Sequence, residues 1–169
     1  MIKLDTKRLT IRNFLPEDWQ ELQEVVVQYQ ATEWAKYEPP WPTSTEEVKG
    51  MTKFFASGDS FLAVSLKDTG KLIGMIAIER RKEQEEPVHN LGYVFHPGYS
   101  GQGYATEGCR AMMAYLFEQL GITAILTGTR PENTPSVRLL ERLGIPPIGN
   151  GEYRLSKEEW LSRKKAPQG

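Results

Sequence analysis

The sequence predicts a single α/β domain over residues 1–169, with a mixed, mostly antiparallel sheet and helices on both faces. Three observations support this class. The length suits one domain with a full core, and no linker or repeat divides the chain. Apolar residues alternate at period two in some segments and recur at helical spacing in others. A glycine-rich loop joins an apolar strand to a long amphipathic segment and then another strand, which implies a central parallel strand–helix–strand unit.

Composition excludes several functional classes. Twenty-one basic residues nearly balance 22 acidic ones, which argues against a nucleic-acid-binding face. No apolar run approaches the roughly 20 residues that cross a bilayer, and residues 1–14 have no signal-peptide pattern. The single cysteine, Cys109, cannot form an intrachain disulfide. We therefore expect a cytoplasmic protein that binds neither nucleic acid nor membrane and holds no metal.

The first third of the chain is predicted as one strand and two helices. Residues 8–14 alternate between apolar and polar, which indicates a strand, and Pro16 opens a helix. The apolar residues at helical spacing are Trp19, Leu22, Val26 and Tyr29. Residues 33–44 are too proline-rich for a helix or strand interior. "STEE" (44–47) predicts a capping box for the second helix, whose expected buried residues are Val48, Met51, Phe54 and Phe55.

The middle of the chain is predicted as three strands. "FLAVSL" (61–66) and "LIGMIAI" (72–78) flank a turn and indicate paired strands, the second covered on both faces. Residues 79–87 are a solvated charge run, and 88–95 are the fourth strand. The helix after the glycine loop has an expected buried stripe of Ala105, Cys109, Met112, Met113, Leu116, Phe117 and Leu120. Its cysteine therefore reads as core and not as a nucleophile.

The C-terminal part is predicted as a strand, a short helix, a hairpin and a last helix. Residues 122–129 form the fifth strand, and 133–144 form a helix with Asn133 or Thr134 as N-cap and Gly144 at its end. Residues 148–155 indicate a shortened hairpin. "SKEE" (156–159) caps a helix that carries Trp160, and residues 163–169 are expected to fray.

The loop "HPGYSGQGYATEG" (96–108) holds four glycines where a strand meets a helix. Glycine weakens both elements, so the exposed backbone must serve some purpose. Free N–H groups and a partial positive charge at a helix start suit a phosphate. Loop composition alone leaves a plain tight connection equally open. The loop matches neither the P-loop nor the dinucleotide fingerprint.

"SGQGYA" (100–105) resembles the acyl-CoA loop of the GNAT acetyltransferase superfamily, usually written Arg/Gln-x-x-Gly-x-Gly/Ala. Gly103 and Ala105 match, whereas Ser100 stands in place of the usual basic or amide residue. Residues 91–108 look like the branch of the ribosomal-protein-alanine N-acetyltransferases, the Rim-type branch. Residues 6–14 resemble the opening of that branch, and 133–145 resemble its N-x-x-S…E-x-x-G segment. The resemblance implies a GNAT-like fold, acetyl-CoA as donor and a primary amine as acceptor.

The resemblance also implies where the donor binds. The pyrophosphate would lie on backbone N–H groups from Gly101 to Thr106, and the pantetheine arm would lie between fourth and fifth strands that splay apart. The implied donor-binding residues are Tyr93, Val94, Phe95, Ser100, Gly101, Gln102, Gly103, Tyr104, Ala105, Thr106 and Asn133. For Asn133, a helix N-cap role is equally expected.

The acceptor amine must be neutral to attack a thioester. A lysine with a pKa of about 10.4 is neutral roughly four times in ten thousand at pH 7, and an α-amine with a pKa of about 8 roughly a tenth of the time. Related enzymes often carry Glu where Asn90 or Leu91 stands, and neither can act as a base. His89 and Glu79 remain as candidate bases, with a structural and a solvated role as their alternatives.

Ser136 matches the serine of the branch and is the candidate general acid. Leu140 stands where many superfamily members carry a tyrosine that protonates the leaving thiolate. Trp34, Tyr37 and Trp41 are expected to line the acceptor pocket, although the same loop could be a lid over the core.

The sequence thus predicts an acetyl-CoA-dependent N-acetyltransferase. The alternatives are a non-catalytic acyl-CoA-binding sensor or interaction module, and a nucleotide-binding domain whose glycine loop holds ATP. Neither the acceptor nor the oligomeric state follows from the sequence; a homodimer is one option.

Overall fold

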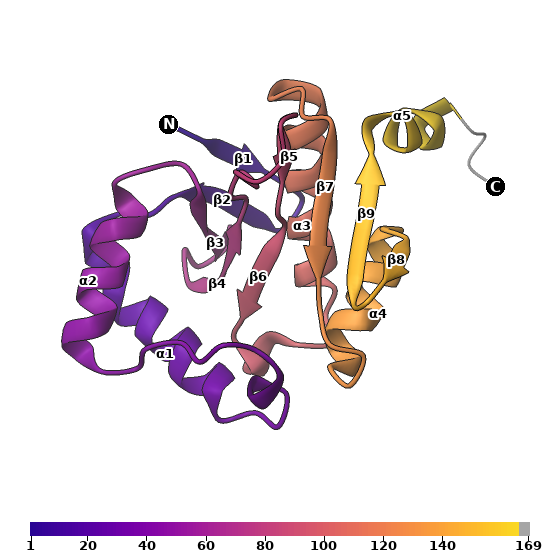
Figure 1. The fold of residues 1–169 in the computed structure, drawn as a ribbon. Coiled ribbons are helices and arrows are strands. Elements are labelled where there is room, and N and C mark those ends of the chain that lie inside the picture. The colour runs from indigo at the N-terminus through magenta and orange to yellow at the C-terminus, as the bar shows by residue number, and fades with distance from the viewer. Residues whose placement is uncertain (166–169) are drawn as a thin grey trace.

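The computed structural model describes residues 1–165, which form two sheets flanked by helices (Figure 1). The first sheet is antiparallel throughout, in the order β1 (Lys3–Asp5), β2 (Leu9–Asn13), β3 (Phe61–Leu66), β4 (Leu72–Ala77), β6 (Gly92–Phe95). The second has the order β5 (Val88–His89), β7 (Ala124–Gly128), β9 (Glu152–Ser156), β8 (Pro147–Gly149). Only β5 and β7 pair in parallel among these strands. The predicted α/β class and its central parallel unit are confirmed, but β1 was not predicted.

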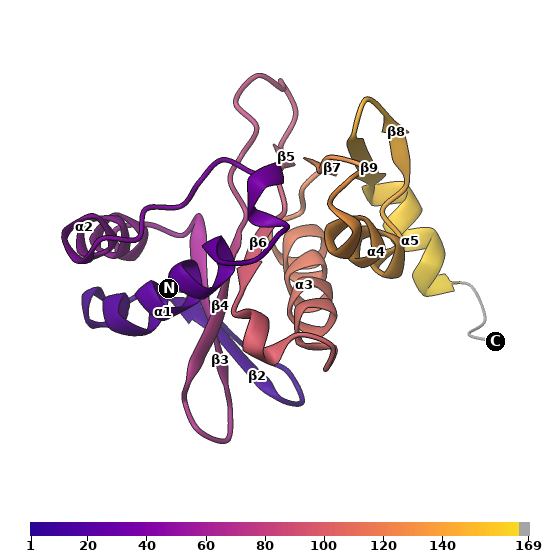
Figure 2. The ribbon, with the colours of Figure 1, turned by 90° about the horizontal axis from the view of Figure 1, so that it is seen from below.

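Helices cover both faces of the first sheet, as predicted (Figure 2). One face carries α1 (Trp19–Gln30), which follows the short 3-10 turn η1 (Pro16–Asp18), and α2 (Thr45–Ala56). The other carries α3 (Tyr104–Ala114), which continues as the π-turn η4 (Tyr115–Gln119). α4 (Thr134–Leu143) packs against α3 on the side of the second sheet (Figure 2). The remaining elements are α5 (Lys157–Lys165) and the 3-10 turns η2 (Ala35–Tyr37) and η3 (Pro97–Tyr99).

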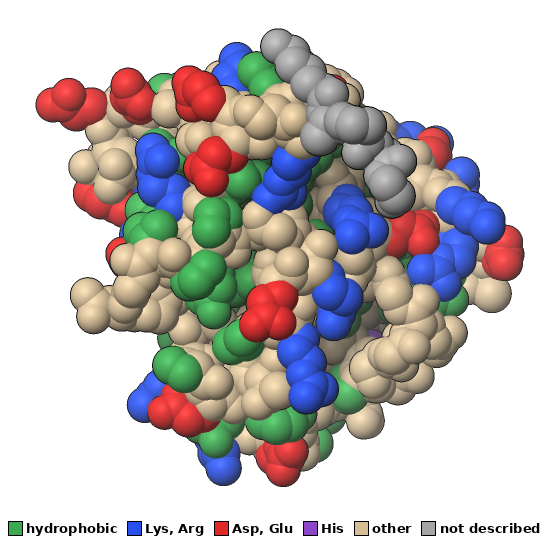
Figure 3. Space-filling view, turned by 90° about the vertical axis from the view of Figure 1, so that its right-hand side faces the viewer, with side chains coloured by type: hydrophobic (Ala, Val, Ile, Leu, Met, Phe, Trp, Pro, Cys, Tyr) green, Lys and Arg blue, Asp and Glu red, His purple; other side chains and the backbone are tan. Residues whose placement is uncertain are grey.

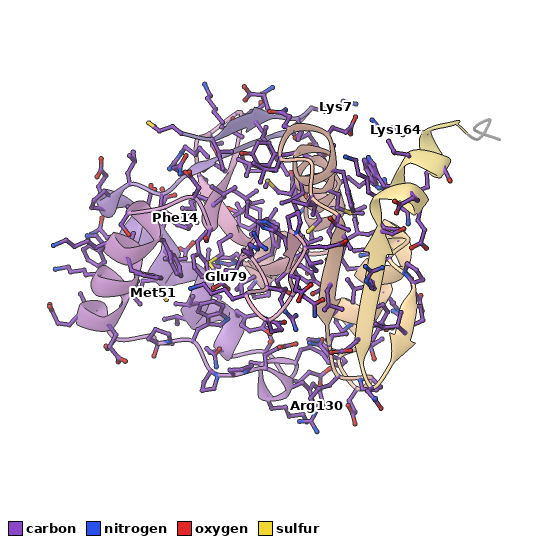
Figure 4. The ribbon with its side chains drawn as sticks, turned by 45° about the horizontal axis from the view of Figure 1, so that its top comes forward. Lys7, Phe14, Met51, Glu79, Arg130 and Lys164 are labelled. Carbon is purple, nitrogen blue, oxygen red and sulfur yellow. The ribbon has the colours of Figure 1, made fainter. Side chains whose placement is uncertain are left out.

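Two apolar cores result, one on each side of the first sheet. Every residue of β4 is buried, which confirms that this strand is covered on both faces. Met75 packs into the core beneath α1 and α2, and Ile76 packs into the core beneath α3. Phe14 and Met51 lie on the α2 side of the sheet (Figure 4).

The prediction of one continuous strand over 88–95 is wrong. The segment splits into β5, which joins the second sheet, and β6, which joins the first. Leu91 lies at the break and is fully buried, and its carbonyl accepts a hydrogen bond from the hydroxyl of Thr127 (2.8 Å). Because that side chain satisfies the carbonyl, the chain can leave one sheet for the other without an unpaired buried group.

Two residues expected in the core are exposed. Phe54 is 65% exposed because α2 turns Val48, Thr52 and Phe55 inward instead. Leu120 is 48% exposed. It follows the π-turn, whose wider winding rotates the helix face away from the sheet. The rest of that stripe, from Cys109 to Phe117, is buried as predicted.

The C-terminal end agrees with the sequence in most respects. Ser156 and Glu159 form a reciprocal capping box, and Trp160 stacks on Phe117 with ring centroids 5.4 Å apart. Fraying is not seen at Arg163, which donates to the carbonyl of Leu143 (2.8 Å). Residues 166–169, the rest of the predicted frayed end, lie outside the described residues.

Acidic and basic side chains are interspersed on the side that carries β8, β9 and α5 (Figure 3), which agrees with the net charge of −1. Within residues 1–165, no helix combines the length and apolarity that a membrane crossing requires.

Candidate active site

A cleft of about 1580 Å³ lies where the two sheets part. The parallel pairing of β5 with β7 spans only two residue pairs, Val88 with Ala124 and His89 with Ile125. Beyond it, β6 pairs with β4 alone and runs away from β7 (Figure 1). The predicted splay of the strands is therefore confirmed.

The open edge of β6 presents backbone groups to this cleft. The N–H groups of Asn90 and His96, which flank β6, donate to the carbonyls of Glu79, just after β4, and Ile73, within β4 (2.8 Å each). Because hydrogen-bonded positions alternate in an antiparallel pair, the even-numbered residues bond β4. Tyr93 and Phe95 direct their N–H and C=O groups to the cleft instead. Val94 was expected to do the same, but its backbone is committed to β4 and its side chain is buried in the core.

The glycine loop adopts the backbone that its composition predicts. Gly101 and Gly103 have φ angles of +77° and +82°, which favour glycine, and Gly103 is the N-cap residue of α3. The carbonyl of Gly103 accepts the N–H of Glu107 (3.0 Å). The first-turn amides of α3, on residues 104–106, have no acceptor within residues 1–165, and these residues line the cleft.

Arg8 and Glu107 hold this loop against β2. Arg8 donates to the carbonyl of Gln102 (2.9 Å) and to the carboxylate of Glu107 (2.7 Å), and its guanidinium lies 4.3 Å from the ring centre of Tyr104. Thr6 donates to the same carboxylate (2.6 Å). Partial burial raises the pKa of Glu107, but the hydrogen bonds from Thr6 and Arg8 outweigh it and hold the pKa below its usual value. Gln102, which the resemblance implies as a residue that binds acetyl-CoA, does not line the cleft.

Four arginines that the sequence analysis missed also line the cleft: Arg8, Arg110, Arg138 and Arg142. Arg142 donates to the hydroxyl of Thr106 (3.1 Å), and Arg110 donates to the backbone carbonyl of Arg142 (3.2 Å). Arginines on helices usually indicate a solvated face. The i, i+4 spacing of Arg138 and Arg142, next to the serine motif, was the one available signal.

Ser136 lies in the first turn of α4 with its hydroxyl 2.6 Å from that of Tyr93, and both line the cleft. Part of Tyr93 is exposed along the cleft, but burial raises its pKa strongly, and the hydrogen bond with Ser136 offsets only part of this. The phenol is therefore protonated at neutral pH. Leu140 is buried and supplies no hydroxyl, as expected.

The two candidate bases from the sequence do not line the cleft. The Nδ1–H of His89 donates to the carbonyl of Ile78 (2.7 Å), which holds the ring between β4 and β5. Glu79 is exposed just after β4 (Figure 4), and its carbonyl accepts the N–H of Asn90 (2.8 Å). Both positions favour the structural and solvated alternatives.

Part of the aromatic loop between α1 and α2 faces the cleft. Trp34 and Trp41 line it, together with Tyr29 of α1. Tyr37 does not line it; its ring lies 6.5 Å from that of Trp34, and the guanidinium of Arg130 lies 5.9 Å from its centre. Arg130 lies at the edge of the molecule (Figure 4).

Glu38 is a cleft residue that the sequence analysis missed. Its Oε1 accepts hydrogen bonds from the side-chain amide of Asn133 (3.2 Å) and the hydroxyl of Thr129 (3.4 Å). Asn133 stands at the N-cap position of α4, but its side chain makes no capping hydrogen bond. The prediction of Asn133 as the N-cap residue is thus correct, but its side chain does not cap the helix. No local pattern could reveal this contact, which joins residues 95 apart.

Cys109 is fully buried, and burial raises the pKa of its thiol to about 12. A thiol of that kind carries almost no thiolate at neutral pH, which agrees with the predicted core role.

The sequence matches the family model described as an acetyltransferase (GNAT) domain over residues 8–145. It is 31% identical to the uncharacterized N-acetyltransferase YnaD of Bacillus subtilis (strain 168), covering 93% of this chain and 98% of that protein. The acetyltransferase (GNAT family) from Bacillus anthracis superposes with a TM-score of 0.84 at 26% identity, over 94% of this chain and 100% of that one. RimL, a ribosomal L7/L12 alpha-N-protein acetyltransferase in complex with coenzyme A, shares the fold with a TM-score of 0.75 at 18% identity, over 95% of this chain and 99% of that one.

Proposed function

The chain belongs to the GNAT acetyltransferase family, with likeness to its Rim-type branch, and we propose that it moves an acetyl group from acetyl-CoA to a primary amine by direct attack in a ternary complex. One observation carries the proposal. A single cleft joins the free amides at the start of α3, the open edge of β6 and the hydroxyl pair of Tyr93 and Ser136. The amides suit a diphosphate, the strand edge suits an amide-rich arm, and the hydroxyls suit a leaving thiolate.

The donor end of the cleft fits the charge and shape of coenzyme A. Free amides at a helix N-terminus attract phosphate oxygens, and the glycines leave the backbone uncovered. Arg110 and Arg142, exposed beside this helix start, would supply positive charge for further phosphate oxygens. Tyr93 and Phe95 would bond the pantetheine arm through their backbones. Bound acetyl-CoA supplies an activated thioester carbonyl.

The proton for the departing thiolate comes from Ser136 in this proposal. A hydroxyl is a weak acid, so the proton must be replaced as it leaves. Tyr93 stays protonated at neutral pH and lies within hydrogen-bond distance of Ser136, so it can resupply the proton along a two-hydroxyl chain. The pair thereby takes the place of the tyrosine that Leu140 excludes.

The test is release of coenzyme A thiol from acetyl-CoA, with and without amines that differ in pKa and size. We expect release that depends on both substrates and yields the N-acetylated amine by mass spectrometry. A protein that binds acetyl-CoA but releases no thiol with any amine would instead be an acyl-CoA-binding module. Stabilisation by ATP but not by acetyl-CoA in a thermal shift assay would identify a nucleotide-binding domain. A ligand at 100 times its Kd adds about 2.7 kcal/mol.

A further inference from the structure

We propose that Glu38 receives the acceptor: its carboxylate pairs with the incoming ammonium group and then takes one of its protons. This inference rests on the proposed function, and it supplies the base that neither His89 nor Glu79 supplies. It starts from where Glu38 lies, between η2 and the prolines 39 and 40, on a loop that lines the cleft.

The carboxylate is anchored but not neutralised. Its Oε1 accepts hydrogen bonds from Asn133 and Thr129, both of which are uncharged donors. The ion pairs formed within residues 1–165 do not include Glu38, and its Oε2 accepts no hydrogen bond from any of those residues. A carboxylate held on one oxygen with the other free is suited to binding a cation that arrives from solution.

The position is also correct for chemistry. Asn133 is the N-cap residue of α4, Ser136 lies three residues later in the first turn, and both line the cleft. Glu38 therefore approaches the Tyr93–Ser136 pair from the acceptor side. The pKa of Tyr93 is raised mainly by burial, and the negative charge of Glu38 raises it further. Glu38 therefore lies close enough to Tyr93 to interact with its phenol electrostatically.

The surrounding groups favour a positive, partly apolar ligand. Tyr29, Trp34 and Trp41 provide aromatic faces in the same cleft, which attract an ammonium group and its carbon chain. Glu33, on the same loop as Glu38, adds another acidic side chain to the lining. The charge of Glu38 contributes to the raised pKa values of Tyr29 on α1 and Tyr93 on β6, whose main cause is burial.

Lys36 on the same loop and Arg130 on the loop after β7 point to the ring of Tyr37, which does not line the cleft. These two cations therefore have a partner outside the cleft, whereas the arginines that line the cleft, Arg8, Arg110, Arg138 and Arg142, form no ion pair with Glu38 within residues 1–165. We expect the acceptor to be a cationic primary amine with an apolar body.

With Glu38 as the base, every proton in the proposed reaction has a source and a destination. The ammonium gives one proton to Glu38, which later releases it to solvent. The amine lone pair then forms the C–N bond to the acetyl carbon while the C–S bond breaks and the sulfur keeps the electron pair. The nitrogen sheds a second proton as the amide forms, and the thiolate takes one from Ser136. Tyr93 returns a proton to Ser136, and the second amine proton restores Tyr93 through solvent, so one proton in total is released.

The experiment compares wild type with Glu38→Gln, using acetyl-CoA and two probe amines, phenethylamine and a hexapeptide with a free N-terminal alanine. Glutamine keeps an oxygen that can accept from Asn133 and Thr129, so the loop contact survives while the charge is lost. Glu46→Gln, the same change on the exposed first turn of α2, is the matched control. Coenzyme A affinity and Tm of both variants check that the fold and the donor site are intact.

We expect Glu38→Gln to lower kcat/KM at pH 7 roughly 100-fold, within the range of general bases. The deficit should close as pH rises above the pKa of each amine, at about 8 for the peptide and about 10 for phenethylamine. If Glu38 had only a structural role, the difference in kcat/KM between wild type and the variant would not disappear at a pH set by the pKa of the amine. The control should match wild type.

Two results would overturn the inference. Equal rates of wild type and Glu38→Gln at every pH would remove Glu38 from the reaction and leave the proposed function standing. A deficit of the same size at all pH values, with a lowered Tm, would assign Glu38 to loop structure alone. Wild type that transfers acetyl groups to neither these nor other amines would overturn the proposed function itself, and this inference with it.

Discussion

The hydroxyl groups of Tyr93 and Ser136 lie 2.6 Å apart and link β6 to the first turn of α4 across the cleft. These residues come from different elements, on opposite sides of the point where the two sheets part. One of them belongs to the edge that would hold the donor, and the other follows Asn133, which contacts Glu38, by three residues. The pair thus marks where donor and acceptor would meet.

Ser136→Ala should lower kcat roughly 100-fold because the thiolate loses its nearest proton donor. Coenzyme A affinity should stay within a factor of two, since the diphosphate and arm contacts come from backbone groups. Tyr93→Phe should act in the same direction, and the double variant should lose little more than Ser136→Ala because the two hydroxyls form one chain. Steady-state kinetics and calorimetric titration with coenzyme A measure both effects. The control is Ser57→Ala, which removes an exposed hydroxyl at the end of α2.

Gly103→Val should abolish donor binding at concentrations where wild type is saturated. The residue has φ +82°, and a Cβ there would lie 3.4 Å from the Arg8 guanidinium, beside the free amides. Gly70→Val is the matched control: it has φ +75° with open space around it, in the turn between β3 and β4. Both variants should lose roughly 1–2 kcal/mol of unfolding free energy from backbone strain. Donor affinity that is equal in the two folded variants would contradict the proposed phosphate site.

Glu107→Gln should make stability less dependent on pH. The pKa of Glu107 is lower in the folded protein, so its carboxylate stabilises the fold above the unfolded pKa of about 4.3. That contribution is lost as pH falls through the folded pKa. Urea unfolding at pH 7 should show wild type more stable than the variant by about 1–2 kcal/mol, and the difference should shrink below pH 4. A difference that is constant between pH 7 and pH 3 would show that the charge is unimportant.

Trp41→Ala should raise the KM for phenethylamine several-fold and leave coenzyme A affinity unchanged, because Trp41 lines the cleft on the loop where we propose that the acceptor binds. Tyr37→Ala, on the same loop but outside that lining, should have the smaller effect. The sequence analysis assigned both residues to the acceptor pocket, so this comparison tests the distinction that the structure introduces. Equal increases in KM would restore the original assignment of Tyr37.

Short sequence signals correctly predicted where most helices begin and end. Ser44 accepts from the N–H of Glu47, Gly144 ends α4 at φ +68°, and Ser156 caps α5, each in agreement with its sequence signal. These features depend on a few consecutive residues, so the sequence contains all that decides them. The same holds for the glycine loop, where positive φ angles and free amides follow from glycine before a helix start.

The fold prediction was wrong where contacts between residues distant in the sequence determine burial or strand pairing. Periodicity placed Phe54 and Leu120 on buried faces, but helix rotation and the π-turn exposed them. Apolar content alone favoured one strand over 88–95, and only the pairing partners of β5 and β6 divide it.

The sequence by itself determined the α/β class, the glycine-rich helix start and the family resemblance, because these depend on composition, spacing and short-range conformational preference. Only the tertiary structure decided which side chains share the cleft. Glu38 meets Asn133 across 95 residues, and Tyr93 meets Ser136 across 43. Such contacts depend on how the two sheets diverge and how the loop between α1 and α2 folds over the opening. That geometry is set by packing between distant elements, and no single stretch of the chain contains it.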